Sequence, residues 1–245
     1  MSKVPAATHT LAILRLLMTT DAPISAARIA AQLRLPRSTT YQLLKVMVDA
    51  GFVMHLKSHR TYGLGAAAYS LAQAYSTQQP LVRASTRHAQ ALAKLAGGSA
   101  HVSRLSSGME VLYVLEERSA AAVSLITDVG VRLAAERTAS GRAMLAALPD
   151  AELKARVDAA GLGRQWQKIH TTVQQVRLRG WAEETEEVSV GQSSIAAAVL
   201  DHTGRPAAAL AVTFTPGVGV DKHAELVTET CRRAQQVHTT LFGAA

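Results

Sequence analysis

The chain has 245 residues and a formal net charge of +8, with 48% hydrophobic and 18% charged residues. This composition is typical of a folded globular protein and excludes a disordered chain. The single cysteine, Cys231, excludes a disulfide framework or a cysteine metal site. Aromatic residues, at 4%, are too few for a platform that stacks single-stranded bases, and no apolar run is long enough to span a bilayer. We therefore expect a cytoplasmic protein with no membrane partner.

The positive charge is concentrated at the N-terminus. Residues 1–65 contain eight Lys and Arg residues against two acids, a net charge of +6, whereas the remaining 180 residues carry only +2. Neutralising phosphates with a local basic surplus provides much of a protein's non-specific affinity for DNA. The asymmetry favours a small DNA-binding module followed by a larger domain.

The first module has the pattern of a helix-turn-helix. Apolar spacing predicts a helix over 8–18, which Asp21-Ala22-Pro23 ends. Ser25 is expected to cap a second helix over 26–33. Pro36 can stand only at or before a first helical turn, so a third helix is predicted over 37–50, ending at Gly51. Two short helices joined by a tight turn form the DNA-binding unit.

The third predicted helix has two faces. Leu43, Val46, Met47 and Ala50 are expected to point inward. The opposite face carries Ser38, Tyr41, Gln42 and Lys45, whose side chains suit base edges and phosphates in a major groove, although an ordinary solvated face would look alike. Strands over 52–56 and 61–64, joined by a basic turn, predict a β-hairpin wing behind this helix. The predicted DNA contacts are Ser25, Arg37, Ser38, Thr39, Thr40, Tyr41, Gln42, Lys45, Lys57, His59 and Arg60.

The rest of the chain mixes helical and strand patterns. The Ala-rich stretch 66–79 predicts a linker helix, and a further helix runs from Pro80 to Gly97-Gly98. The remaining expected elements are strands over 99–106, 110–116, 121–126, 193–200 and 206–215, and helices over 140–148, 150–160, 172–179 and from Asp221, as a cap, to about 241. This order predicts an α+β fold with a mostly antiparallel sheet. The predicted domains are 1–65, a linker helix over 66–79, and 80–245.

Three motifs in order resemble one known family over nearly the whole chain. The first is LPRSTTYQLL at 35–44, followed by GFV at 51–53 and YGLG at 62–65. The second is VGVRL at 129–133 followed by TASGRAMLA at 138–146. The third is RGWA at 179–182, with Glu187, Gly191 and SIAA at 194–197. Together these motifs are similar to those of IclR-type bacterial transcriptional regulators.

The resemblance implies a winged helix-turn-helix DNA-binding domain, a linker helix used in dimerisation, and a C-terminal domain that binds a small molecule, often an organic acid. By position, the effector-binding residues would be Leu133, Thr138, Ala139, Ser140, Glu184, Ser194, Ala211 and Thr213. Several positions depart from the usual pattern: Ser194 replaces a frequent Cys, Ala211 a Ser, Ala134 a Pro, Glu136 a His, Ala198 a Pro, and Gln42 a frequent Arg. These departures affect which effector and which operator the chain recognises.

The predicted pocket has features of an anion site. Ser140 is expected to cap the helix that it opens, and the N-terminus of that helix favours a carboxylate. Three nearby arginines, Arg132, Arg137 and Arg142, either add positive charge there or are solvated. His101, in a predicted strand, either faces the pocket or is a core histidine.

Two other classes of function remain to be weighed. An enzyme is disfavoured because the chain has none of the nucleophile, metal or phosphate motifs, so no catalytic residue, cofactor or metal is expected. The acidic run at 183–187 is more often a solvated turn than a cation site. An architectural DNA-binding protein without an effector would explain the basic module but not the larger domain. We predict a homodimer on a near-palindromic double-stranded operator, and leave open whether dimers pair into tetramers.

Overall fold

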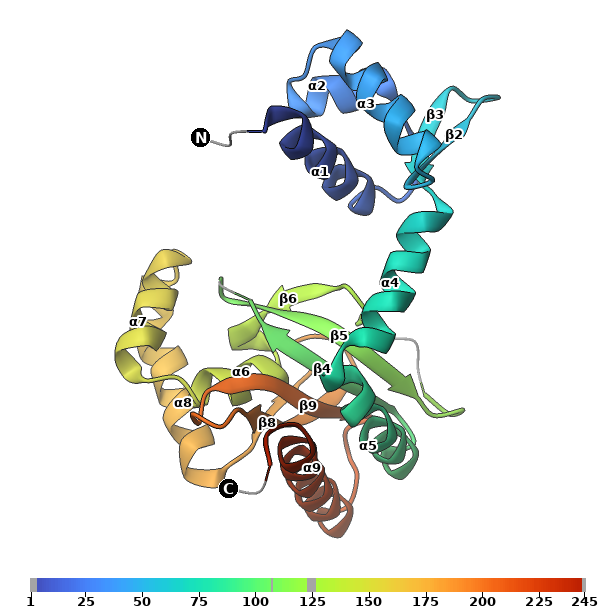
Figure 1. Cartoon of the computed structure of the whole chain (residues 1–245). Coiled ribbons are helices and arrows are strands. Elements are labelled where there is room, and N and C mark those ends of the chain that lie inside the picture. The colour runs from blue at the N-terminus through green and yellow to red at the C-terminus, as the bar shows by residue number, and fades with distance from the viewer. Residues whose placement is uncertain (1–3, 107, 123–126, 244–245) are drawn as a thin grey trace. The chain divides into compact units, whose positions relative to one another are not determined.

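The computed structural model describes residues 4–106, 108–122 and 127–243. The chain divides into two compact units, Met1–Gln78 and Gln79–Ala245, which are described separately (Figure 1). Within the described residues, none of the helices is both long and apolar enough to cross a bilayer.

The N-terminal unit packs helices against a small antiparallel sheet with strand order β1-β3-β2. Its elements are α1 (Pro5–Met18), β1 (Ile24–Ser25), α2 (Ala26–Leu33), α3 (Arg37–Asp49), β2 (Val53–Leu56), β3 (Thr61–Leu64) and α4 (Ala66–Gln78). Ile13, Ile29 and Leu44 are fully buried at the centre of its core. The predicted helix-turn-helix and hairpin are confirmed. The sequence did not reveal β1, whose Ile24 and Ser25 pair with Tyr62 and Thr61 of the hairpin.

The inward face of α3 differs from the prediction. Thr40, Leu44 and Met47 are buried, whereas Val46 is 66% exposed and Ala50 is also exposed. The buried residues follow the spacing i, i+4, i+7 of one helical face. A polar residue belongs to this face because the Thr40 hydroxyl donates a hydrogen bond to the carbonyl oxygen of Pro36 at 3.0 Å, which removes the cost of burying it.

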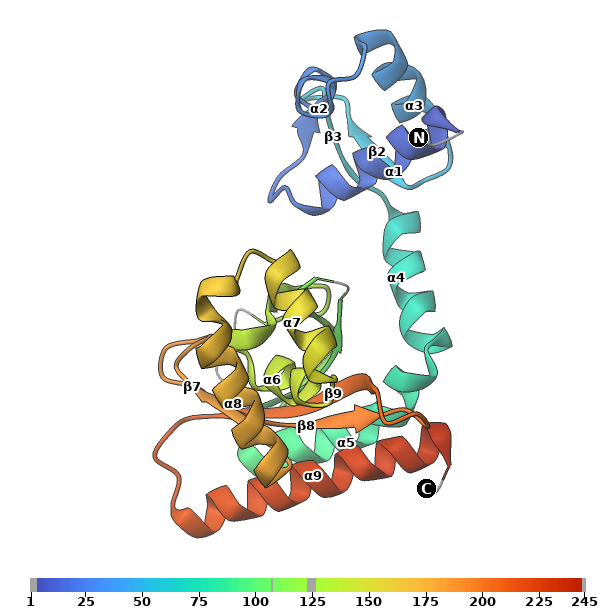
Figure 2. The ribbon, with the colours of Figure 1, turned by 90° about the vertical axis from the view of Figure 1, so that its left-hand side faces the viewer.

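The C-terminal unit is built on a six-stranded sheet of order β6-β5-β4-β9-β8-β7, in which every neighbouring pair is antiparallel. Figure 2 shows α5 and α9 along one side of the sheet and α6, α7 and α8 on the other. Its strands are β4 (Ser99–Leu105), β5 (Glu110–Arg118), β6 (Arg132–Ala134), β7 (Ala182–Thr185), β8 (Ser193–Leu200) and β9 (Pro206–Phe214); its helices are α5 (Pro80–Ala96), α6 (Ala139–Ala146), α7 (Asp150–Ala159), α8 (Trp166–Arg179) and α9 (Val220–Phe242), with short 3-10 turns η1 (Ala135–Arg137) and η2 (Gly163–Gln165). The predicted α+β class with an antiparallel sheet is confirmed.

Two layers of apolar side chains hold the sheet to its helices. Residues of α5 and α9, such as Leu92 and Leu226, form one core with β4, β8 and β9. Met144, Leu153 and Val173 form the second core, on the side of α6, α7 and α8. Burial of such side chains contributes about 25 cal/mol per Å² of apolar surface, so both faces of the sheet are stabilised by packing.

Several elements differ from the predictions. The expected strand over 121–126 is not formed at Ala121 and Ala122, and 123–126 lie outside the described residues. The edge strands β6 and β7 were not predicted, and α8 begins six residues before the expected start. Asp221 does not cap α9, because Gly219 occupies the N-cap position. Strands of three or four residues carry too little alternation to be recognised from sequence.

Candidate DNA-binding surface and enclosed cavity

The outward face of α3 carries the polar set expected for base contacts. Ser38, Tyr41, Gln42 and Lys45 are all exposed, and Tyr41 is 54% exposed despite its ring. Arg37 is exposed at the first position of the helix, and Thr39 is half-buried. Four long or polar side chains at i, i+3, i+4 and i+7 present one continuous surface that can reach into a groove.

Two predicted DNA contacts have structural roles instead or in addition. Thr40 is fully buried, and its hydroxyl is held by Pro36, so its prediction as a DNA contact is wrong. Ser25 is the N-cap of α2, and its Oγ accepts a hydrogen bond from the backbone N–H of Arg28 at 3.3 Å. Capping satisfies one of the free N–H groups of the first turn and leaves Ser25 half-buried at the end of α2.

The tip of the hairpin is basic and exposed. Lys57, His59 and Arg60 are exposed at this turn, and the Ser58 hydroxyl lies 2.9 Å from Nδ1 of His59. Arg60 has a left-handed φ of 51°, a conformation that costs a non-glycine residue energy. Behind the tip, the rings of His55 and Tyr62 stack at 4.4 Å between centroids, which stiffens the hairpin that presents the basic side chains.

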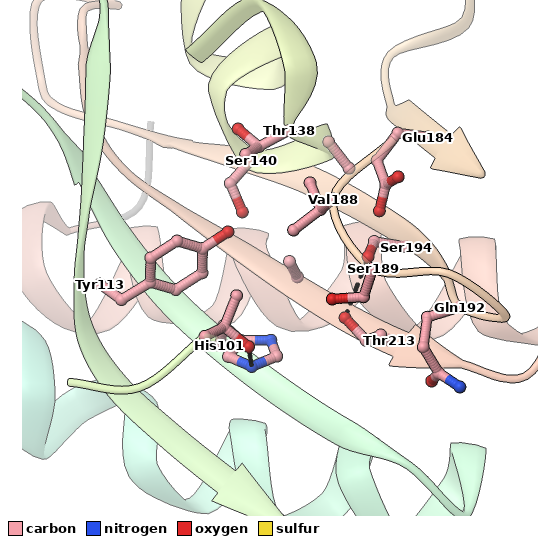
Figure 3. Close-up of a pocket in the computed structure, with 13 residues that line it drawn as sticks. His101, Tyr113, Thr138, Ser140, Glu184, Val188, Ser189, Gln192, Ser194 and Thr213 are labelled. Atoms are coloured by element: carbon pink, nitrogen blue, oxygen red, sulfur yellow. Dashed lines mark hydrogen bonds between the residues drawn. The ribbon is translucent and has the colours of Figure 1, made fainter. Parts of the chain in front are cut away.

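The C-terminal unit encloses a small polar cavity of about 20 Å³ (Figure 3). Seven of the eight residues predicted from the resemblance line it: Thr138, Ala139, Ser140, Glu184, Ser194, Ala211 and Thr213. Leu133 does not, because it packs half-buried against the core formed by α6, α7 and α8. His101, for which both a pocket and a core position were left open, also lines the cavity, together with five residues that the prediction omitted: Tyr113, Thr127, Val188, Ser189 and Gln192.

Strand register explains how distant residues meet at the cavity. Glu184, Ser194 and Thr213 form one row across β7, β8 and β9. Ala211 and His101 are direct partners in a second row across β9 and β4. Directly opposed residues of an antiparallel pair point to the same face, so His101 faces the cavity together with Ala211. The sequence left the position of His101 open because it does not reveal that β4 pairs with β9.

His101 is fixed by a charged network. Its Nε2 lies 3.0 Å from the Thr127 hydroxyl and 3.3 Å from Oε1 of Glu116. Arg118 holds the same carboxylate through Nε and Nη2 at 2.8 and 2.9 Å. Burial opposes ionisation of Glu116, but hydrogen bonds from His101 and Arg118 outweigh it and lower its pKa. The ionised Glu116 favours a proton on Nε2 of His101, which leaves Nδ1 as an acceptor in the neutral ring.

Glu184 is the acidic group of the cavity. It is only 3% exposed, and burial raises its pKa although it accepts hydrogen bonds from Ser194 and from backbone N–H groups. One of these bonds joins its Oε2 to the backbone N–H of Glu187 at 3.0 Å. Burial, with the charges of Glu184 and Glu116, also raises the pKa of Tyr113. Ser194 and Thr213 share a hydroxyl hydrogen bond of 3.0 Å, so hydroxyls and a carboxylate stand side by side in the lining.

Helix α6 starts at the cavity, but Ser140 does not cap it. The backbone N–H of Gly141 donates to the Thr138 hydroxyl at 2.9 Å, so Thr138 is the N-cap. Ser140 is the second residue of the helix and lines the cavity instead. The capping prediction was wrong by two positions, because η1 continues to Arg137 before the helix begins.

The three arginines expected near the pocket do not line it. Arg142 is 9% exposed and donates to the carbonyl oxygens of Glu136 and Glu183, each at 2.8 Å. Its Nη2 also contacts both carboxylate oxygens of Glu187, at 2.6 and 2.7 Å. Arg137 donates to the Glu187 carbonyl oxygen, and Arg132 lies 3.8 Å from Glu110. Of the two readings left open for these arginines, added pocket charge does not hold: Arg132 and Arg137 are exposed, and Arg142 is buried in an ion pair.

The acidic side chains of residues 183–187 point to different partners and do not form one cluster. Glu184 faces the cavity, Glu187 pairs with Arg142, and Glu183 pairs with Arg179 at 2.9 Å. In the part of the chain that the structure describes, no three His, Cys, Asp or Glu side chains gather into a group that could hold a metal ion.

Comparison with known proteins accounts for both halves of the chain. The family profile described as the IclR helix-turn-helix domain matches residues 6–56, and the profile described as the bacterial transcriptional regulator IclR C-terminal matches residues 73–239. The chain belongs to the IclR family. It is therefore a DNA-binding transcriptional regulator and not an enzyme.

Relatives within the IclR family cover nearly the full chain. The HTH-type transcriptional repressor AllR of Klebsiella pneumoniae is 27% identical over 234 residues, which are 91% of this chain and 85% of that protein. An IclR transcriptional regulator from Alicyclobacillus acidocaldarius has a similar fold, with a TM-score of 0.84, 18% identity and coverage of 98% and 99%. An IclR homolog from Microbacterium hydrocarbonoxydans, solved in complex with 4-hydroxybenzoate, has a TM-score of 0.81, 20% identity and coverage of 96% and 98%.

Proposed function

We propose that this regulator binds a near-palindromic operator as a homodimer, and that a small organic acid in the cavity of the C-terminal unit controls its occupancy. In this proposal residues 1–65 bind DNA, 66–79 serve as a dimerisation linker and 80–245 bind the effector. DNA binding in a bacterium also assigns the protein to the cytoplasm. Two dimers could also join into a tetramer and still bind a near-palindromic operator.

The support for the DNA contacts is the exposed polar face of α3. Gln42 can bond adenine at N6 and N7, and Tyr41 and Ser38 can bond bases or phosphates. Arg37, Thr39 and Lys45 flank this face, and the wing tip adds Lys57, His59 and Arg60. Ser25, at the N-terminus of α2, can reach a phosphate with its backbone N–H or hydroxyl. A dimer would place two such heads in successive major grooves.

The single observation that carries the effector assignment is the enclosed polar cavity. The N-terminal end of α6, with Thr138, Ala139 and Ser140, favours a negative charge. Glu184, on β7, already accepts hydrogen bonds within the protein, and its carboxylate oxygens can accept a further one from a ligand that donates. No Lys or Arg is among the lining residues that the structure describes. These features together favour an acid that also carries a hydroxyl, with its carboxylate at α6 and its hydroxyl at Glu184.

The size of the cavity bears on the mechanism. About 20 Å³ is just above the roughly 10–15 Å³ that one water molecule needs, so any organic acid must enlarge the cavity as it binds. The lining includes Val188, Ser189 and Gln192 from the loop between β7 and β8. An effector that displaces this loop binds the two states of the protein unequally, which is the condition for changing operator occupancy.

Affinity selection on random duplex DNA tests the proposal. The full chain is selected at about physiological salt, where non-specific binding is weak, and the enriched duplex becomes a probe for fluorescence anisotropy. Enrichment of an inverted repeat, with affinity changed by a hydroxylated acid such as 4-hydroxybenzoate, supports the proposal. If an inverted repeat is enriched but a panel of organic acids has no effect on affinity, the effector assignment is overturned. If no sequence is enriched, the proposal of a near-palindromic operator is overturned.

Two variants connect the effect to the cavity. Ser194→Ala removes a cavity hydroxyl that bonds Thr213 and should weaken the response to the acid by about five- to tenfold, as expected for one hydrogen bond. Thr228→Ala removes an exposed hydroxyl on α9, which bonds the carbonyl oxygen of Ala224 in its own helix, and should leave the response unchanged. Equal responses in both variants would place the effector elsewhere.

A further inference from the structure

A second hollow lies in the C-terminal unit, and Arg142 is one of its lining residues. Its volume is about 210 Å³, and we call it the α6–α8 groove. It is lined by Glu136, Arg137, Arg142, Leu145, Gln165, Lys168, Ile169, Thr172, Val173 and Glu187. None of these residues lines the enclosed cavity. The volume is below the roughly 300–1,000 Å³ of drug-sized ligand pockets, which suits a compact ligand.

The floor of the groove is rigid and apolar. Leu145 of α6 and Val173 and Ile169 of α8 are at most 4% exposed, and these two helices pack directly against each other. Figure 2 shows α6 and α8 side by side. Close-packed interiors deform little, so the groove is a preformed feature of the unit.

The rim of the groove carries charges of both signs that the protein does not neutralise. Arg142 and Glu187 satisfy each other. Glu136, Arg137 and Lys168 form no ion pair within the described ranges 4–106, 108–122 and 127–243. Oε2 of Glu136 is buried and lacks a hydrogen-bond partner among the described residues, and leaving a buried acceptor unpaired has a free-energy cost. A ligand that donates to this oxygen would recover that cost.

We propose that the α6–α8 groove is a second small-molecule site that binds a compact amino acid, with acidic amino acids preferred. The ammonium group of the ligand pairs with Glu136, and its carboxylates pair with Lys168 and Arg137. The carboxylate of Glu136 and the two cations of Arg137 and Lys168 complement a molecule with one ammonium group and two carboxylates. Charge-assisted hydrogen bonds of this kind are about twice as strong as neutral ones, and the apolar floor accepts the short methylene chain.

Two ligand pairs isolate the role of the ammonium group. Aspartate differs from succinate, and glutamate from glutarate, only by the amino group. Binding is measured with the full chain by isothermal titration calorimetry at near-neutral pH. We expect saturable binding of at least one acidic amino acid, at least tenfold tighter than binding of the dicarboxylate that lacks the amino group. Absence of saturation by either amino acid up to about 20 mM, or equal affinities within both pairs, would overturn the proposal.

Variants test which side chains carry the selectivity. Glu136→Gln keeps the shape of the side chain and should abolish the preference for the amino acid over its dicarboxylate partner. Lys168→Gln, on an exposed position of α8, should weaken both members of a pair about tenfold or more, because it removes a charged partner. Ser194→Ala alters a residue of the enclosed cavity that does not line the groove, and it should change neither the affinity nor the preference. A preference retained in Glu136→Gln, or lost in Ser194→Ala, would contradict the assignment of the groove.

Discussion

Arg142 and Glu187 are joined by two short contacts, of 2.6 and 2.7 Å, from one guanidinium nitrogen to both carboxylate oxygens. The pair connects α6 to the loop that follows β7, although 45 residues separate its members. The same loop contributes Val188 and Ser189 to the enclosed cavity. The ion pair therefore holds in place the loop that forms one wall of the cavity.

Removing Arg142 should destabilise the C-terminal unit strongly. Arg142→Met leaves Glu187 and two carbonyl oxygens without their donor. Breaking a fully buried ion pair costs about 3–5 kcal/mol, and we expect the lower end of this range because only Arg142 is buried. Glu187→Gln should cost less, about 1–3 kcal/mol, because its side chain is 37% exposed. The measurement is urea unfolding followed by tryptophan fluorescence, since both tryptophans, Trp166 and Trp181, lie in this unit.

Arg232 provides the matched control for this measurement. It pairs with Glu229 on the surface of α9 at 2.7 Å, and exposed pairs contribute about 0–1 kcal/mol. Arg232→Met should therefore change the free energy of unfolding by less than about 1 kcal/mol. A cost for Arg142→Met no larger than this would show that the buried pair does not hold the loop.

Gly141 should not tolerate a methyl group. A Cβ at this position would lie 2.1 Å from the carbonyl oxygen of Ala135, so η1 and α6 would have to separate. We expect Gly141→Ala to lower the free energy of unfolding by about 1–3 kcal/mol or more. In Gly163→Ala the nearest atom to the new Cβ is Oδ1 of Asp158 at 3.5 Å, and the same unfolding measurement should give a change within about 0.5 kcal/mol.

The cavity carboxylate should make stability depend on pH. Burial raises the pKa of Glu184, so the folded state holds the proton more tightly than the unfolded state. Its contribution to stability is full below the unfolded pKa and is lost as the pH rises through the folded pKa. Glu184→Gln cannot ionise, and it should gain stability relative to the wild type as the pH rises from about 4 to 7.

Chemical unfolding at several pH values measures this difference. Ser140→Ala trims another cavity side chain without removing an ionisable group, so its difference from the wild type should stay constant over the same range. A constant difference for Glu184→Gln would mean that the carboxylate titrates alike in the folded and unfolded chains.

Base preference should depend on Gln42. We expect Gln42→Ala to reduce discrimination at one operator base pair by about 1–3 kcal/mol, measured by binding to a set of single-substitution duplexes. Thr40→Val, two residues away but buried, should cost about 1 kcal/mol of stability through the lost bond to Pro36 and leave base preference intact. If Gln42→Ala preserved the preference, α3 would not be the helix that reads bases.

The wing should contribute affinity without sequence preference. Lys57→Ala and Arg60→Asn should weaken all duplexes alike and reduce the slope of log affinity against log salt by about one each. Asn is chosen at position 60 because φ there is 51°, and Asn tolerates this region better than Ala. Lys222→Ala, on α9, is the control and should leave the slope unchanged. A changed base preference in Lys57→Ala would assign base contacts to the wing.

Features that depend on neighbouring residues were mostly predictable from the sequence, whereas contacts between distant residues were not. The cap at Ser25 and the hairpin were predictable because residues within a few positions determine them. The inward face of α3 was predicted wrongly although its cause is also local: the apolar pattern does not include Thr40, whose hydroxyl bonds the carbonyl oxygen of Pro36, and it includes Val46, which is exposed. The roles of the arginines were also missed. Arg142 is close in sequence to residues that line the cavity, but its partners Glu183 and Glu187 are 41 and 45 residues away along the chain.

Ser25 has two roles that connect the parts of the DNA-binding head. Its side chain begins α2, and its backbone pairs with Thr61 at the base of the wing. A displacement of the wing is therefore passed to the start of the helix pair. Where the wing follows a wide or a narrow stretch of the duplex, we expect α3 to tilt in the adjacent groove. Operator choice would then depend on the local shape and stiffness of the DNA as well as on its bases.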